Sequence, residues 1–420
     1  MKNALLAAFA AGLLAFTACD IVEFGAETPV ETPSKDAGLT GEQVDVTGIP
    51  ADVRKVFLLN EGGMGANNAT LDFLRVIDGN YVNGAFRKMN PEAGEGLGDV
   101  GNDIAVCGDE LWIVVNNSGI VEVLSAKDET EIAAIPVPTP RYIAFDDKYA
   151  YVTSWAGAYV NGNYDAGYYA VTDYKNPKGQ VYRINLASKK VEGSVEVGYQ
   201  PEGIACHDGK LYVANSGGIA SQLPPDYAYD NTVSIIDTKL FQVVGSQVVQ
   251  VNLKNVYSDG KGTIYVTTLG NFWDVHSGLY LFPASDPSRV SRAGERSAIR
   301  DDQLHVSCSC ILGDTVYCIG TEDEFDWSGP HTYYAWSVTV SDVATGEGKF
   351  SLYPLRLTGT PYGMAVVGHA SSLDIHDVLV GDAGDYFNPG TVSLYSLDYN
   401  DNARLWSVTS GVCPGHFAIW

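Results

Sequence analysis

The chain has few basic residues for its length. Lysine and arginine account for 26 of its 420 residues, against 51 aspartates and glutamates, which gives a formal net charge of −25. Such a charge disfavours contact with nucleic acid or with an anionic membrane surface, because phosphate groups require clusters of basic side chains. We therefore expect no nucleic-acid partner.

Familiar catalytic and metal-binding motifs are also missing. The sequence contains no His-Glu-x-x-His motif, no nucleophile elbow and no phosphate loop. Its seven histidines show no metal-ligand spacing, although His276 and His331 stand in long predicted loops. The acidic stretch Glu322–Glu324 with Asp326 and the loop Asp382–Asp385 match no defined calcium loop. We predict that the protein is not an enzyme, has no metal site and has no cofactor.

An uncharged apolar run lies at the amino terminus. Lys2 is followed by apolar residues from Ala4 to Phe16 and then by Thr17, Ala18 and Cys19. The run is too short to span a bilayer and has the form of a signal sequence. It resembles bacterial lipoprotein signals, apart from Phe16, where a smaller aliphatic residue is usual. The resemblance implies a signal peptide over residues 1–18, lipidation of Cys19 and an outer-membrane, lipid-anchored location exposed at the cell surface.

Residues 19–50 have a different composition from the rest of the chain. Seven acidic residues stand against the single basic residue Lys35, and large apolar residues are few. Repelling carboxylates with little apolar surface cannot offset the entropy of ordering, so we expect an extended tether. The lipid on Cys19 is then the sole contact of the protein with the membrane.

Residues 51–420 contain a repeated phrase. Its variants are Pro140–Ala144, Pro201–Ala205, Pro361–Ala365, Pro414–Ala418 and Gly101–Ala105, with two degenerate copies at Leu253–Tyr257 and His305–Cys310. Each copy except the last is followed by a polar turn and further β-branched or aromatic runs that alternate as strands do. The spacing predicts an all-β, seven-bladed β-propeller of four-stranded blades. The segment Val56–Leu59 has no phrase before it, so it should pair with the final phrase and close the ring.

The phrase, together with Asp208–Asn215, resembles the YncE-like, or YVTN-type, propellers. The segments Asn60–Gly63 and Asn67–Thr70 are also similar to the opening blade of propeller lipoproteins of Bacteroidota, and within that group to the BtuG-like surface lipoproteins. That second resemblance implies a protein that binds cobalamin and works with a TonB-dependent outer-membrane transporter. The corrinoid would be a ligand, not a cofactor.

Aromatic residues are concentrated in the long connections between the second and third strands of the blades. These connections all open on one face of a propeller, whereas the connections between the first and second strands are short polar turns. Tyrosine and tryptophan offer stiff contact surfaces with a polar edge, which favours a recognition surface over small cores within the loops. The candidate ligand-binding residues are Asn60, Asn116, Arg141, Trp155, Tyr168, Glu202, Asn215, Tyr227, Tyr229, Trp273, Trp327, Tyr362, Asp385, Tyr386, Phe387 and His416.

Three functions remain open at this stage. Aromatic rings interleaved with amides and carboxylates suit a corrinoid, whose apolar macrocycle carries amide groups, and they suit glycans almost as well. A propeller hydrolase or lyase with an acidic pair or a calcium ion at the channel mouth is the third. Six cysteines follow Cys19, most of them in predicted strands, and we expect buried free thiols because a large propeller needs no disulfides.

Overall fold

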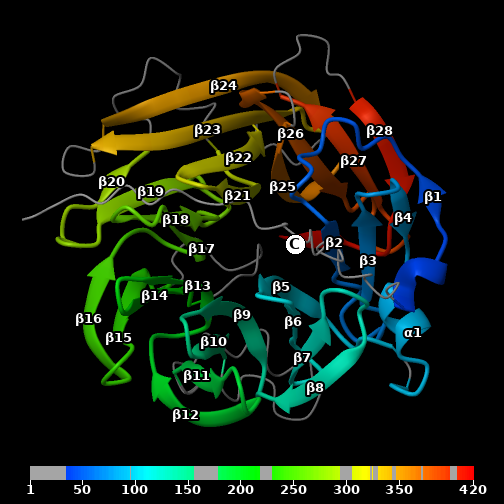
Figure 1. Cartoon of the computed structure of the whole chain (residues 1–420). Coiled ribbons are helices and arrows are strands. Elements are labelled where there is room, and N and C mark those ends of the chain that lie inside the picture. Colours follow the sequence, from blue (N-terminus) through cyan, green and yellow to red (C-terminus); the bar gives the residue numbers. More distant parts are fainter. Residues whose placement is uncertain are drawn as a thin grey trace, which may run out of the picture. The chain divides into compact units, whose positions relative to one another are not determined.

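Short β-branched and aromatic segments form antiparallel sheets arranged in a ring. The computed structural model describes residues 35–94, 96–155, 178–217, 229–293, 305–321, 324, 330–342, 347–369, 372–397 and 404–420. Residues Lys35–Trp420 belong to one folded unit. Its strands form seven sheets around a common axis (Figure 1). The predicted seven-bladed β-propeller is confirmed.

Each blade contributes four strands from the axis outward. The innermost strands are β5 (Gly101–Cys107), β9 (Pro140–Phe145), β13 (Pro201–His207), β17 (Leu253–Ser258), β21 (Cys308–Leu312), β25 (Pro361–His369) and β29 (Pro414–Ile419). The second strands are β2 (Lys55–Asn60), β6 (Glu110–Val115), β10 (Tyr149–Ser154), β14 (Lys210–Asn215), β18 (Thr263–Thr268), β22 (Thr315–Thr321) and β26 (Ser372–Asp382). All predicted copies of the phrase therefore lie at innermost strands, although β21 begins only near the end of the copy His305–Cys310.

The outer half of each blade follows the same order. The third strands are β3 (Thr70–Arg75), β7 (Ile120–Ser125), β11 (Gln180–Asn185), β15 (Thr232–Asp237), β19 (Gly278–Pro283), β23 (Tyr333–Asp342) and β27 (Thr391–Ser396). The fourth strands are β4 (Asn80–Val82), β8 (Glu131–Pro136), β12 (Lys190–Glu196), β16 (Gln242–Val248), β20 (Ser291–Arg292), β24 (Glu347–Leu357) and β28 (Arg404–Thr409). A short strand β1 (Glu42–Gln43), a helical turn η1 (Lys35–Gly38) and helix α1 (Ala85–Met89) complete the described elements. None of the described helices is long and apolar enough to cross a membrane.

The ring is closed by strands from the two ends of the folded unit. Strand β2 pairs antiparallel with β29, with Val56 opposite Ile419 and Leu58 opposite Phe417. Blade 1 thus consists of β29, β2, β3 and β4, with the two-residue strand β1 added outside β4. Blades 2 to 7 follow in chain order, so that blade 2 is β5–β8 and blade 7 is β25–β28. Pairing the ends inside one sheet protects both strand edges, and the predicted closure is confirmed.

The apolar core lies between neighbouring blades. Trp112 of β6 packs in a cluster with Ile143 and Val152 of the next blade, and Tyr212 of β14 packs with Ile264 and Val266 of the blade after it. These second-strand side chains are almost fully buried because a blade faces a neighbour on each side. Burying each large side chain contributes about 1.5–3 kcal/mol, so stability is distributed around the ring.

The two ends of the blades differ in their connections. Innermost strands begin, and second strands end, at the same end of the blade, as the pairing of Pro140 with Ser154 illustrates. We call this end the loop face, because the connections from second to third strands and from blade to blade lie there. The opposite end, where tight turns join first to second and third to fourth strands, is the turn face. All the long connections of the sequence therefore belong to one face, as predicted.

Six of the seven innermost strands carry a register shift just after they begin. Such a β-bulge adds a residue to one strand and redirects its side chain. The phrase glycines allow the innermost strands to approach: a Cβ on Gly203 would lie 2.7 Å from Cα of Asn255, and one on Gly363 would lie 2.2 Å from the carbonyl oxygen of Gly415. Strand β21 pairs with β22 without such a shift.

Part of the acidic segment at residues 35–50 is folded onto the propeller. Asp36 is buried, and its carboxylate lies 2.8 Å from Nζ of Lys55 and 3.4 Å from Nη1 of Arg75. Lys55 also contacts Glu129 of blade 2 at 2.6 Å. We call Asp36, Lys55, Arg75 and Glu129 the closure cluster. Residues 35–50 are therefore not part of the extended tether that composition predicts, because the contacts of Asp36 with Lys55 and Arg75 attach this segment to blade 1.

The described cysteines are not paired in disulfides. Cys107, Cys206, Cys308, Cys310, Cys318 and Cys413 are all free thiols. Burial raises the pKa of Cys310 to about 12 and, with Asp146 and Asp147 nearby, that of Cys206 to about 11. Such thiols are poor nucleophiles. All six thiols are free, as expected, but only Cys308, Cys318 and Cys413 are buried, and the other three are partly exposed.

Candidate ligand-binding site

Polar side chains from the phrase positions meet at the axis on the loop face. The group comprises Glu61, Asp103, Arg141, Tyr142, Glu202, Lys254, Tyr362 and His416, which we call the axial cluster. Its members come from blades 1, 2, 3, 4, 5 and 7, and most follow the first residue of an innermost strand by one or two positions. The bulges explain this placement, because they bring two successive residues out of the usual alternation.

Arg141 and Glu202 form a buried ion pair between blades 3 and 4. The carboxylate Oε2 of Glu202 accepts hydrogen bonds from Nη2 of Arg141 at 2.9 Å and from Nε at 3.2 Å. The other oxygen, Oε1, accepts one from the indole nitrogen of Trp155 at 3.1 Å, and the Arg141 guanidinium lies 4.4 Å from that ring. The pair is therefore fully bonded, which offsets the cost of burying two charges. Arg141, Trp155 and Glu202, all predicted site residues, lie together.

Contacts between non-adjacent blades locate the cluster on the axis. The ring of Tyr142 in blade 3 lies 6.2 Å from that of His416 in blade 1, and Nζ of Lys254 in blade 5 lies 5.4 Å from the Tyr142 ring. Burial alone would lower the pKa of Lys254, but Tyr142 and Glu202 raise it, so Lys254 stays protonated. A cation is thereby held among aromatic and acidic groups at the channel.

Glu61 joins blades 1 and 7. Its Oε1 lies 2.8 Å from Nε2 of His416, and its Oε2 accepts a hydrogen bond from the hydroxyl of Tyr362 at 2.6 Å. Burial opposes ionisation, yet the hydrogen bond and charge of His416 lower the pKa of Glu61 below its usual value. The predicted site residues Tyr362 and His416 are thus both held by Glu61, which is not among the predicted site residues.

Asp103 carries the most perturbed carboxylate of the axial cluster. Burial raises its pKa to about 6, although His416 and the backbone N–H groups of Ile143 and Ile104 favour the charged form. These two N–H groups donate to separate oxygens, each at 2.9 Å. The side chain therefore ties β5 to β9 and can also exchange a proton near neutral pH.

An exposed tryptophan stands on a fixed loop of blade 5. In the connection between β18 and β19, the buried side chain of Asn271 accepts hydrogen bonds from the backbone N–H groups of Trp273, Asp274 and Val275 at 2.8–3.0 Å. This turn leaves the Trp273 side chain 51% exposed. An apolar ring that is held in water by a rigid loop is a candidate contact for a ligand.

A similar turn in blade 7 presents two more aromatic rings. Asp385 accepts hydrogen bonds from the N–H groups of Phe387 and Asn388 at 2.9 and 2.8 Å, and these bonds lower its pKa. Tyr386 is 48% exposed and Phe387 is 85% exposed. The Tyr386 ring makes an edge contact with Tyr362, with centroids 5.8 Å apart. This contact joins the loop to the axial cluster.

A cavity of about 310 Å³ lies between blades 6 and 7. Arg356 of β24, Asp382 of β26, Tyr395 of β27 and Arg404 of β28 contribute to its wall. The volume is at the lower limit for a drug-sized ligand. A macrocycle therefore requires the open loop face and not this cavity.

Three predicted asparagines are buried and serve the fold. Asn116 donates to the carbonyl of Pro140 at 2.8 Å, Asn60 donates to Oγ1 of Thr70 at 3.0 Å, and Asn215 donates to hydroxyls of its own blade. Each stands at the end of a second strand, and none is more than 2% exposed. Their amides link strands below the loop face and are not presented to a ligand there.

Four predicted residues lie outside the part of the chain that the structure describes: Cys19, Tyr168, Tyr227 and Trp327. Tyr229 is described and is partly buried, and burial raises the pKa of its hydroxyl.

The sequence also indicates three axial residues that are not among the predicted site residues. Lys254 occupies the same phrase position as Arg141 and Glu202, and Asp103 and Tyr142 occupy that of His416. Extending the chosen positions to every copy of the phrase would have found all three. Glu61 directly follows the second strand β2 and lies outside every copy of the phrase, so the phrase does not predict its position.

Comparison with known proteins supports the fold and goes no further. No family model matches the chain, and no curated protein matches its sequence. Among solved structures, hydrazine synthase of Kuenenia stuttgartiensis is similar, with a TM-score of 0.52 and 15% sequence identity over 75% of this chain and 88% of that one. The chain shares a β-propeller fold with that protein. At this identity the likeness carries no information on activity.

Proposed function

We propose that the protein is a cell-surface lipoprotein that captures a corrinoid on the loop face and passes it to a TonB-dependent outer-membrane transporter. The observation that carries the proposal is that Trp273, Tyr386 and Phe387 are held exposed by fixed turns on the face that also bears the axial cluster. A corrinoid combines a broad apolar macrocycle with peripheral amides, so it needs both kinds of surface. The likeness of the opening blade to BtuG-like proteins supports this choice of ligand.

Binding of this kind relies on groups that are already in position. The aromatic loops would cover the macrocycle, while the partly exposed Lys254, Glu61 and His416 supply donors and acceptors for its amides. Because these charged groups are bonded to one another before the ligand arrives, little side-chain entropy is lost on binding. No bond is made or broken, which suits transfer to a second protein.

Calorimetry with cyanocobalamin tests the proposal. We expect the purified protein to bind one equivalent with a dissociation constant in the micromolar range or below. Trp273→Ala and Phe387→Ala should each weaken binding by about tenfold or more, since they remove aromatic contacts. Ile77→Ala is the matched control, because Ile77 is 91% exposed on the turn face. An absence of binding at micromolar protein, or equal losses in all three variants, would reject corrinoid capture.

The same titration separates corrinoids from glycans. Sugar faces stack on aromatic rings, and carboxylates accept hydrogen bonds from sugar hydroxyls. Heat with oligosaccharides and none with cyanocobalamin would make the protein a glycan-binding lipoprotein that uses the same loops.

One observation favours a hydrolase or lyase as a second candidate. Glu61, His416 and Asp103 bring two carboxylates and an imidazole to the axis, and the pKa of Asp103 lies near 6, where proton transfer at neutral pH is efficient. We would incubate the protein with the oligosaccharides that it binds and analyse the products by chromatography. Cleavage that is lost in Glu61→Gln and retained in Ile77→Ala would establish an enzyme.

Lipid anchoring is tested separately. Metabolic labelling with palmitate should mark the wild-type chain and leave Cys19→Ala unlabelled. Protease treatment of intact cells should degrade the anchored protein if it is exposed at the surface. Labelling that persists in the variant would exclude Cys19 as the lipidation site.

A further inference from the structure

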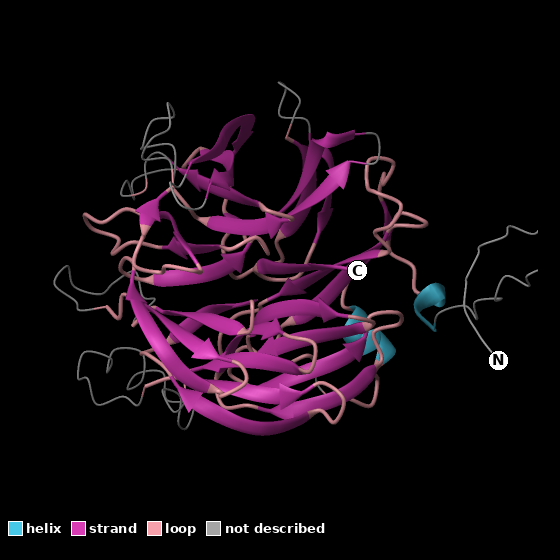
Figure 2. Cartoon of the chain, turned by 60° about the vertical axis from the view of Figure 1, so that its left-hand side comes forward, coloured by secondary structure: helices cyan, strands magenta, loops and turns pink. Residues whose placement is uncertain are grey.

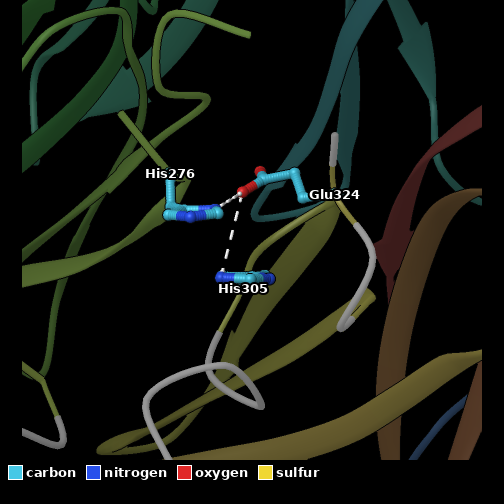
Figure 3. Close-up of side chains that lie close together, drawn as sticks. All are labelled: His276, His305 and Glu324. Atoms are coloured by element: carbon cyan, nitrogen blue, oxygen red, sulfur yellow. Dashed lines mark hydrogen bonds and ion pairs between the residues drawn. The ribbon is translucent and has the colours of Figure 1, made fainter. Parts of the chain in front are cut away.

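Two histidines and a glutamate converge between blades 5 and 6, away from the axial cluster (Figure 3). His276 belongs to the connection between β18 and β19, His305 precedes β21, and Glu324 follows β22. Their potential ligand atoms all lie within 4.8 Å of one another. All three connections belong to the loop face. We propose that these side chains bind a divalent transition-metal ion of the zinc class.

The distances are close to those of a coordinated ion. Nδ1 of His276 lies 3.0 Å from Oε2 of Glu324, and Nε2 of His305 lies 3.9 Å from the same oxygen. Tetrahedral donors around zinc lie about 3.4 Å apart, given zinc-to-ligand distances of about 2.0–2.2 Å. Binding therefore requires His305 to approach Glu324 by about 0.5 Å and His276 to move away from it by about 0.4 Å. Figure 3 shows the two stacked rings beside this one carboxylate, which forms the shorter contact with His276.

The surrounding contacts orient each ligand. Nδ1 of His305 lies 2.5 Å from the carbonyl oxygen of Thr321, and a carbonyl only accepts, so the proton of a neutral imidazole is on Nδ1. Nε2, which lies 3.9 Å from Glu324, then carries the lone pair that can bind an ion. This backbone bond is the second-shell contact that metal-bound histidines usually make. Glu324 in turn accepts hydrogen bonds from the backbone N–H of Ser277, at 3.1 Å to each oxygen.

A simple ion pair does not account for the whole arrangement. His276 is 46% exposed and could form a surface pair with Glu324, but the His305 side chain is only 4% exposed and stacks on His276 with centroids 4.7 Å apart and an interplanar angle of 8°. The two imidazoles and the carboxylate offer two nitrogen donors and one oxygen donor, and the stacked rings turn on binding so that both in-plane lone pairs meet one ion. This is the donor set of many catalytic zinc sites and leaves at least one coordination position open.

The site would fasten two blades together at the loop face. His276 follows Trp273 in the same loop, whereas His305 and Glu324 belong to blade 6. A bound ion would therefore fix the Trp273 loop against the neighbouring blade, and its open position would be reached from solvent beside His276. The proposal depends only on these three side chains and not on the identity of any organic ligand.

Zinc titration of the full-length protein, purified without a polyhistidine tag, is the test. We expect one zinc equivalent to bind and to raise the thermal midpoint. His276→Gln and Glu324→Gln should each weaken zinc binding by at least about tenfold. Neither change should unfold the chain, because His276 is half exposed and glutamine retains an oxygen that accepts from Ser277. His207→Gln is the matched control, since His207 lies at the turn-face end of β13 and contacts Ser258.

Cobalt supplies a second readout. Substitution with Co²⁺ should give a visible absorption spectrum of a nitrogen- and oxygen-ligated ion that disappears in His276→Gln and persists in His207→Gln. The proposal is overturned if the wild-type protein binds no zinc, if the two cluster variants bind zinc as tightly as wild type, or if an intense thiolate-to-cobalt band shows that cysteines hold the ion.

Discussion

Two buried groups of charged side chains lie at opposite faces of the propeller. The closure cluster is at the turn face, where Lys55 begins β2 opposite Arg75 of β3. The axial cluster is at the loop face, where the innermost strands begin. Both bring charges from distant parts of the sequence into contacts of 2.6–2.9 Å. They differ in their surroundings, because the axial cluster alone adjoins exposed aromatic loops.

The difference shows that burial of charge does not by itself identify a functional site. In the closure cluster, Nζ of Lys55 contacts Asp36 and Glu129 and also donates to the carbonyl oxygen of Lys127 at 2.6 Å. These bonds join the amino-terminal segment, the closing blade and its neighbour, so the cluster serves the fold. In the axial cluster, Lys254, Glu61 and His416 are partly exposed at the loop face, where a ligand can reach them.

The largest effect is expected from Lys55→Met. The change leaves Asp36 and Glu129 buried without their cation, so the free energy of unfolding should fall by about 3–5 kcal/mol. Chemical denaturation followed by tryptophan fluorescence measures the loss. Lys261→Met, which removes an exposed pair with Asp314, is the control and should change stability far less. Equal losses in the two variants would contradict a structural role for the closure cluster.

Glu202→Gln is expected to have the next largest effect. Arg141 loses its counter-charge, but glutamine keeps an oxygen for the indole of Trp155, so the expected destabilisation is about 2–3 kcal/mol. Unlike Lys55→Met, this variant should also weaken ligand binding by the folded protein. Binding that is weakened equally by both variants would remove the functional distinction between the clusters.

Glu122→Gln tests how much a buried carboxylate with no cation beside it lowers the stability of the fold. Glu122 of β7 belongs to neither cluster, and burial, with repulsion from Glu131, raises its pKa from about 4.5 to about 7. Because the pKa of Glu122 is higher in the folded than in the unfolded state, protonation favours folding. This contribution to the free energy of unfolding is lost as the pH rises from about 4.5 to 7. The variant should therefore be more stable than wild type by about 1–2 kcal/mol at pH 8 and nearly equal to it at pH 4. Thermal melts at both pH values provide the measurement, and a stabilisation independent of pH would refute this account.

The smallest change in stability is expected for Trp273→Ala and Phe387→Ala. Both rings are largely in solvent, so the free energy of unfolding should change by less than about 0.5 kcal/mol. Their melting temperatures, compared with that of Ile77→Ala, check this. A large loss would mean that the aromatic loops form small cores, which is the alternative to a recognition surface.

The sequence was sufficient for the ring and its closure. Repeated phrases such as Pro201–Ala205 mark innermost strands, and alternation in segments such as Val233–Ile236 marks third strands. The seven blades follow from these local signals. Even the degenerate copy Leu253–Tyr257 could be recognised, because Val256 takes the position of Ile204 opposite a valine of the second strand.

Contacts between distant segments could not be predicted in this way. Composition assigned Asp36 to a tether, since nothing near it in the chain reveals the buried Lys55. His276, His305 and Glu324 are separated by 29 residues (305 − 276) and 19 residues (324 − 305), which matches no metal motif. Only the ring, which brings the connections of blades 5 and 6 together, places these three side chains side by side (Figure 2 shows the same sheets from the side).

Most strand residues both pair through their backbone and contribute a side chain. The bulges at the start of six innermost strands free some residues from the pairing. Residues such as Arg141, Glu202 and Lys254 occupy positions that the ladder of paired backbone groups skips, so their identity is not constrained by sheet registry. The polar groups of the axis can therefore differ from blade to blade without a change in strand pairing, although paired residues such as Arg141 and Glu202 have to change together. Substitutions at these unpaired positions could therefore change which ligand the loop face selects while the strand pairing is kept.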